Sequence, residues 1–185
     1  ETGERHQLTD GMADAISPVW DASGDYLYFL ASTNYGLNTG WLDMTSYDRP
    51  VTRALYVAIL ASDGTTPFAP RSDEEGEAAD DDAAEAAAGG DDAGQDAPTV
   101  RIDMAGMADR IVAAPDLPLR DYTGLVAGPE GYVFVLENAS GSPGSTVHRY
   151  GLEEREATDY ATGVSDVTVS HDRESLLHRS GSAWS

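Results

Sequence analysis

Short apolar stretches separated by turn residues make up most of the chain, and three segments repeat one pattern. Segments 17–30, 123–136 and 166–177 align without gaps. Each has an alternating apolar run, a turn of about five residues and a second apolar run, which is typical of a β-hairpin. Glycine, aspartate and serine in the turns, as in 21–25 and 128–131, favour a reversal of the chain. The pattern therefore predicts three strand–turn–strand units.

Other apolar runs predict further strands and no long amphipathic helix. Residues 53–60 have the continuous apolar character of a buried strand. Segments 147–152 and 157–160 are expected to pair with each other. Segments 99–103 and 109–113 flank a short connection in the manner of a hairpin. The predicted fold class is all-β.

The spacing of the repeats indicates how the strands are organised. Val126 and Val169 lie 43 residues apart, and a period of about 40–45 residues with several strands per unit is typical of propeller blades. The distance from Trp20 to Val126 is longer, and insertions at 34–50 and around an acidic segment account for most of the excess. We expect a partial β-propeller of about three incomplete four-stranded blades, which bury their faces only against neighbouring blades of a larger ring.

The charge of the chain is concentrated in that acidic segment. The chain has 11 basic and 33 acidic residues, a formal net charge of -22, and every basic residue is arginine. Residues 72–98 hold eleven of the acids, no base and no large apolar side chain. Such a segment is predicted to be a disordered acidic linker, with propeller blades in 1–71 and in 99–185. A calcium-binding role is the alternative, although the carboxylates lack the spacing of an EF-hand.

The composition excludes several classes of function. An acidic surface repels both the phosphate backbone of nucleic acids and anionic membranes. The absence of cysteine excludes disulfides and zinc–thiolate sites. No apolar run approaches the ~18 residues of a membrane-spanning helix, and the polar start lacks the regions of a signal peptide. We therefore expect a cytoplasmic protein and no metal or cofactor in this chain. The chain is also expected to begin within a longer protein.

A distinctive stretch carries a family resemblance. Residues 40–50 read Gly-Trp-Leu-Asp-Met-Thr-Ser-Tyr-Asp-Arg-Pro, which resembles a stretch in a propeller of the tricorn protease and its bacterial homologues. The resemblance continues on both sides of this stretch, at 8–20, 67–75, 100–115 and 163–184. The acidic segment departs from it, because relatives often mix lysine with glutamate there.

The resemblance implies a large serine peptidase that acts on short peptides and contains two propellers, a PDZ-like domain and catalytic domains. This chain resembles the later blades of the second propeller. Its expected partners are the remaining blades, the PDZ-like and catalytic domains and peptide substrates, in a homo-oligomer of the full-length protein. The alternative is a propeller that binds a protein partner without peptidase activity, similar to TolB.

Because the family's catalytic residues lie in another region, no catalytic residue is predicted in this chain, and the histidines have structural interpretations. His171 falls in an expected exposed turn, whereas His148 and His178 lie on expected strands and are more typical of packing on a sheet face. His6 lies in the polar start of the chain. A metal pair of His171 and His178 lacks a third ligand at a recognised spacing.

Three further features of the sequence lie in expected turns and insertions. Gly141-Ser-Pro-Gly-Ser145 is a flexible turn and lacks the pattern of a nucleophile elbow. Asn138-Ala-Ser140 is formally a glycosylation sequon, without meaning in a cytoplasmic protein. The apolar side chains of the insertion dock a neighbouring domain, line an access path or cover their own blade; they are Trp41, Leu42, Met44 and Tyr47.

Limited proteolysis tests the prediction for the acidic segment. Because a like-charged segment without large apolar residues is open to a protease, the first cuts are expected between Ser72 and Pro98. Mass spectrometry of the early fragments would locate the cuts. First cuts inside 123–136 or 166–177 would contradict the predicted linker.

Overall fold

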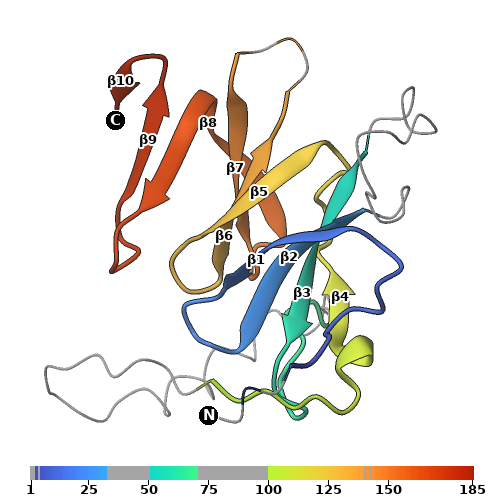
Figure 1. Ribbon diagram of the computed structural model, residues 1–185. Coiled ribbons are helices and arrows are strands. Elements are labelled where there is room, and N and C mark those ends of the chain that lie inside the picture. Colours follow the sequence, from blue (N-terminus) through green and yellow to red (C-terminus); the bar gives the residue numbers. More distant parts are fainter. Residues whose placement is uncertain (1–2, 4, 33–50, 71–99, 140, 142) are drawn as a thin grey trace, which may run out of the picture.

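The structure is a computed structural model that describes residues 3, 5–32, 51–70, 100–139, 141 and 143–185. The described residues confirm the all-β class, since their only helix is the short 3-10 helix η2, Met107–Arg110. The strands form two antiparallel sheets, one of four and one of six strands (Figure 1). The described residues contain no closed ring of sheets.

The first sheet is a simple meander in which neighbours in sequence are neighbours in space, in the order β1-β2-β3-β4. Both predicted insertions interrupt this one sheet, because 34–50 falls between β2 and β3 and 72–98 falls between β3 and β4. The insertions themselves lie outside the described residues. Strand β4, which follows the second insertion in the sequence, completes this sheet. The strands are β1 Ala15–Trp20, β2 Tyr26–Ser32, β3 Arg53–Ile59 and β4 Ile111–Ala113.

The second sheet has the order β10-β9-β8-β7-β6-β5 and is also a meander. The third sequence repeat, 166–177, provides the end of β8 and the start of β9, so it shares this sheet with the second repeat. The expected pairing of 147–152 with 157–160 is confirmed by β7 and β8. The strands are β5 Tyr122–Ala127, β6 Tyr132–Glu137, β7 Ser145–Gly151, β8 Glu156–Val169, β9 Leu176–Ser180 and β10 Ala183–Trp184.

All three predicted hairpins are present. The residues that pair next to the turns are Trp20 with Leu27, Ala127 with Val133, and Val169 with Leu176. The second turn is one residue shorter than the other two. The ungapped alignment therefore matches Val126 to Trp20 and Val169, although Ala127 is the residue that occupies the equivalent paired position. Alternation along each strand was sufficient to locate the hairpins, whereas the length of a turn was not readable from it.

The predicted hairpin of 99–103 with 109–113 is wrong. Residues 100–103 form no strand, and β4 pairs with β3 instead. The chain between them turns at Gly106, whose φ of 69° is left-handed and readily accessible only to glycine, and then enters η2. Arg110 holds this turn against the first sheet by donating to the carbonyls of Ala105 and Ile59, at 2.8 and 3.1 Å.

A β-bulge recurs in the first strand of each repeat. One extra residue lies between Ile16 and Val19 of β1, between Tyr122 and Gly124 of β5, and between Val164 and Asp166 of β8. A bulge bends its strand and increases the local twist. The three repeats therefore share a backbone irregularity as well as a hydrophobic pattern.

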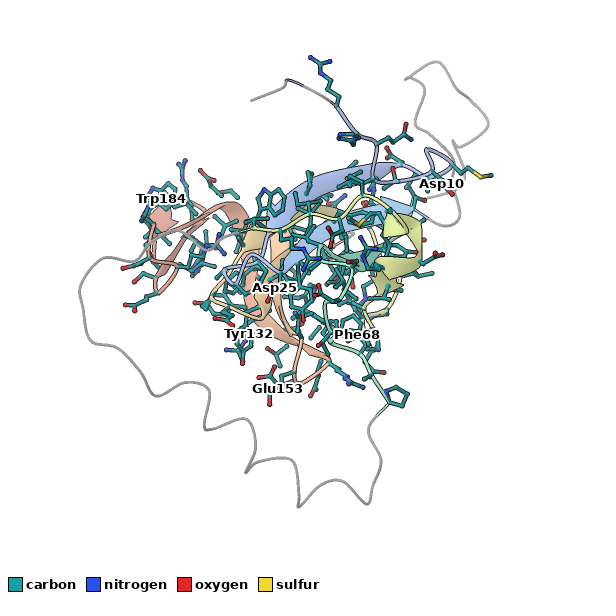
Figure 2. The ribbon with its side chains drawn as sticks, turned by 90° about the horizontal axis from the view of Figure 1, so that it is seen from below. Asp10, Asp25, Phe68, Tyr132, Glu153 and Trp184 are labelled. Atoms are coloured by element: carbon teal, nitrogen blue, oxygen red, sulfur yellow. The ribbon has the colours of Figure 1, made fainter. Side chains whose placement is uncertain are left out.

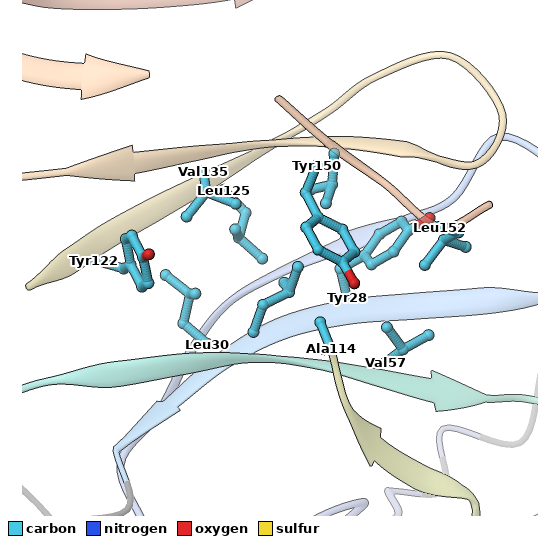
Figure 3. Close-up of a cluster of buried hydrophobic side chains, with 11 residues drawn as sticks. Tyr28, Leu30, Val57, Ala114, Tyr122, Leu125, Val135, Tyr150 and Leu152 are labelled. Atoms are coloured by element: carbon cyan, nitrogen blue, oxygen red, sulfur yellow. The ribbon is translucent and has the colours of Figure 1, made fainter. Parts of the chain in front are cut away.

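The apolar side chains form three clusters that alternate with the sheets. The inter-sheet cluster fills the space between the two sheets, where Tyr28 and Leu30 of the first sheet face Val135 and Tyr150 of the second (Figure 3). A second cluster covers the far face of the first sheet, where Leu8 and Met107 lie against Phe29. The third covers the far face of the second sheet, where the end of β8 and β9 fold over it; it includes Phe134, Val147, Val164, Val167, Val169 and Leu176.

The first strands of the repeats lie next to one another. Strand β1 lies against β5, and β5 in turn contacts β8. The turn of the third repeat also reaches the first repeat, since Arg173 donates to the carbonyl of Trp20 at 3.3 Å. The three repeats thus form successive layers whose first strands meet on one side of the molecule.

Substitution at two adjacent leucines of β9 tests the third layer. Leu176 packs into the cluster on the far face of the second sheet, whereas Leu177 is 45% exposed. We expect Leu176→Ala to lower the free energy of unfolding by about 2 kcal/mol, because it removes packed methyl groups. The control Leu177→Ala is expected to change it by less than about 0.5 kcal/mol. Equal effects in urea denaturation would contradict the layer.

Candidate functional site

The turn of the first repeat contains a buried carboxylate that links the two sheets. Asp21 is only 3% exposed. One of its oxygens accepts from the hydroxyl of Tyr28 at 2.7 Å and from the backbone N–H of Gly131, in the turn of the second repeat, at 2.9 Å. The other oxygen accepts from the backbone N–H and the hydroxyl of Ser23, at 2.9 and 2.7 Å. All these donors satisfy a charge that would otherwise be costly to bury.

The tyrosines of the inter-sheet cluster are held in their neutral, donating form. Burial, and after it the Asp21 carboxylate, raises the pKa of Tyr28 well above its usual value. Burial raises the pKa of Tyr122 to about 12 and also raises the pKa of Tyr150. The hydroxyls of Tyr122 and Tyr150 donate to the carbonyls of Pro118 and Pro115. The aromatic core therefore has no unsatisfied hydroxyl at these three positions.

A cavity of about 370 Å³ opens beside Asp21, between the turns of the two sheets. Figure 2 shows Asp25, Tyr132 and Glu153 at this end of the molecule. Tyr132 donates to Glu154, which raises the pKa of Tyr132, and the guanidinium of Arg149 lies 5.2 Å from its ring centre. The lining is rich in carboxylates and favours positively charged groups; it includes Asp25, Glu130, Glu153, Glu154, Tyr26 and Tyr132.

A second polar cluster lies at the opposite end of the inter-sheet space. His148 on β7 is 6% exposed, and its Nε2 and Nδ1 atoms lie 2.7 Å from Glu137 and 2.8 Å from Asp159. Arg120 donates to the same oxygen of Glu137 at 2.9 Å. Both ring nitrogens therefore face carboxylate oxygens of neighbouring strands. With both nitrogens engaged by carboxylates, His148 joins neighbouring strands, and its ring packs edge-to-face with that of Tyr122.

Arg53 connects the sheets beside this cluster. Its backbone N–H donates to the carbonyl of Arg120 at 2.8 Å, and its guanidinium donates to the carbonyl of Tyr122 at 3.0 Å. The same guanidinium forms an ion pair of 3.1 Å with Asp14. The two sheets are thus linked by polar contacts at both ends, through Asp21 at one and Arg53 at the other.

The structure separates the histidines that the sequence singled out. His171 is exposed in the turn after β8, as expected, and His178 lies half-buried on β9. His6 is exposed near the start of the described chain. Within the described residues, no three His, Cys, Asp or Glu side chains are placed to hold a metal ion. The expected packing of His148 on a sheet face is confirmed, although its two carboxylate partners were not foreseen.

The other features singled out in the sequence lie in turns and strands or fall outside the described residues. Ser145 begins β7, and Gly141 and Gly144 have left-handed φ values, as suits a turn. Asn138 donates its side-chain amide to Asp121 at 2.9 Å. The stretch 40–50 with its apolar side chains, and Ser140 of the sequon, lie outside the described residues.

Sequence inspection missed Asp21 and the partners of His148. A signal for Asp21 was present, because an aspartate followed by serine two residues later is typical of a turn in which the side chain accepts from the backbone. Nothing in the sequence indicated that Gly131, 110 residues later, would donate to it.

Comparisons with protein-family models, with curated proteins and with solved structures found no match to this chain. Among the helical residues that the structure describes, none belongs to a helix long and apolar enough to cross a membrane.

A pair of conservative substitutions tests the role of Asp21. Asp21→Asn keeps the size of the side chain but turns one acceptor into a donor that faces N–H and O–H groups. We expect it to lower the free energy of unfolding by about 2 kcal/mol, the cost of an unsatisfied buried group. Asp25→Asn, on an exposed side chain of the same turn, is the control. An equal change for both variants in chemical denaturation would contradict the link between the sheets.

Proposed function

We propose that this chain is a non-catalytic β-propeller segment of a tricorn-like serine-type peptidase that degrades short peptides. The propeller would restrict or guide access of peptides to a catalytic centre in another part of the protein. The observation that carries this proposal is the layered arrangement of the repeats, in which β1, β5 and the end of β8 are adjacent and each layer packs on the next.

The two outer faces of this arrangement support a ring. On the far face of the first sheet an apolar groove of about 260 Å³ has the stacked rings of Phe29 and Tyr56 among its lining. At the other end, Leu177 and Trp184 are 45% and 48% exposed. A further blade on each side would cover these apolar surfaces, as neighbouring repeats do in a propeller.

The sequence between β2 and β3 supports the choice of family. The Gly-Trp-Leu-Asp-Met stretch that begins at Gly40 resembles the tricorn family, and in the sequence it falls between two neighbouring strands, where insertions are tolerated. The chemistry of the described histidines supports a non-catalytic role. His148 has both nitrogens engaged, and His171 and His178 belong to a turn and to a different strand.

A serine-directed fluorophosphonate probe tests this function in the protein from the complete reading frame. We expect the probe to label a serine outside residues 1–185 and to abolish hydrolysis of short peptides, because the nucleophile lies in another domain. His171→Ala and His178→Ala are the controls, and both are expected to leave kcat unchanged.

Two outcomes would contradict the proposal. Labelling of a serine within 1–185 would place the chemistry in this chain. A protein with a ring of such sheets but with neither labelling nor peptide hydrolysis would favour the TolB-like binding module instead.

A further inference from the structure

His148 is the one histidine of the described chain whose ring is buried between carboxylates. Its side chain is 7% exposed, and it spans three strands by bonding to Glu137 at the end of β6 and to Asp159 on β8. The two carboxylates differ in environment, because the side chain of Glu137 is 14% exposed and that of Asp159 is 79% exposed. The ring therefore has one inner and one outer partner.

The charged groups around the ring come from several elements. Arg120, just before β5, shares the Glu137 oxygen with Nε2 of His148, at 2.9 Å from its own guanidinium. The uncharged ring of Tyr122 on β5 lies in an edge-to-face arrangement with the imidazole, at 6.2 Å between ring centres. Arg53 on β3 faces the same region but is paired with Asp14 and lies 3.9 Å from Asp121. The inner partner of His148 is thus also hydrogen-bonded to a permanent cation, whereas the outer partner, Asp159, is bonded to the imidazole and interacts with Arg120 through its charge.

We propose that His148 is a pH-sensitive fastener of β8, which holds this strand to the sheet only while the imidazole carries both protons. When the ring loses a proton, the nitrogen facing Asp159 is the one to lose it, because a lone pair facing the buried carboxylate of Glu137 is more costly than one facing the exposed Asp159, which water can solvate. Two lone pairs then face each other at 2.8 Å, and the exposed Asp159 turns to water. The charged ring makes both bonds, so the fastening is present at low pH and is lost as the pH rises through the titration of the ring.

The position of this bond makes β8 the element that responds. His148 pairs with Asp159 beside a bulge of β8, where the register shifts between Val147 and His148. The bulged part of β8 leads into its second half, which forms the third layer with β9. Release of Asp159 therefore loosens the strand that carries the third layer, while the first sheet keeps its own contacts. This inference depends on the described contacts and not on the proposed peptidase function.

Hydrogen exchange on either side of the titration midpoint of His148, with the midpoint measured by NMR of its ring, tests the proposal. After correction for intrinsic exchange rates, we expect the protection of the amides of β8 to fall about fivefold above the midpoint, the equivalent of one ordinary hydrogen bond. The amides of β2 and β3 are expected to keep their protection and serve as the internal reference.

Two matched variants make the test specific. Asp159→Asn keeps the fastening at both pH values, because its amide accepts from the charged ring and donates to the neutral ring. It is expected to abolish the fall in protection. Asp166→Asn removes an exposed carboxylate from the same strand away from His148 and is expected to keep the wild-type response.

The proposal is overturned if wild-type β8 is equally protected on both sides of the midpoint. It is also overturned if Asp159→Asn retains the full response, or if all strands lose protection together. An active peptidase with an unchanged β8 would refute the fastener alone, and the fastener would stand if the full protein proved not to be a peptidase.

Discussion

Packing between the two sheets is the interaction on which the remaining structure depends. An isolated meander exposes two faces, and each apolar side chain that it buries contributes about 1.5–3 kcal/mol. The inter-sheet cluster supplies such burial to both sheets at once through side chains such as Tyr28, Leu55 and Val133. The polar contacts of Asp21 and Arg53 then hold the two sheets in one relative position, since an apolar contact alone is not directional.

The same arrangement recurs one layer further along. The far face of the second sheet is covered by the end of β8 and by β9, so one sheet packs on both sides. The bulge shared by β1, β5 and β8 bends each first strand at a similar place, which suits strands that must lie close together. In the sequence both long insertions fall between strands of the first sheet, and the described strands on either side of each pair with one another. A ring of repeated layers is the architecture that would extend this packing.

The buried charged groups stabilise contacts between strands. Asp21, Arg53 and His148 each bind partners on other strands, and these partners satisfy charges that would be unfavourable in an apolar interior. In the proposed peptidase, the catalytic residues would then lie in other domains. A change in the charge of one such group would therefore act on contacts between strands, as proposed for His148 and β8.

The sequence by itself determined the class and the local units: alternation and turn residues were enough to place the hairpins around 21–25, 128–131 and 170–175. The predicted hairpin of 99–103 with 109–113 was wrong, because an apolar pattern does not show which strands will pair. Strand β4 pairs with β3 instead. Only the tertiary structure decided the partners of Asp21 and His148, the recurring bulges and the order of the layers. These features depend on contacts between residues far apart in the chain, whereas periodicity reports only the face on which each side chain lies.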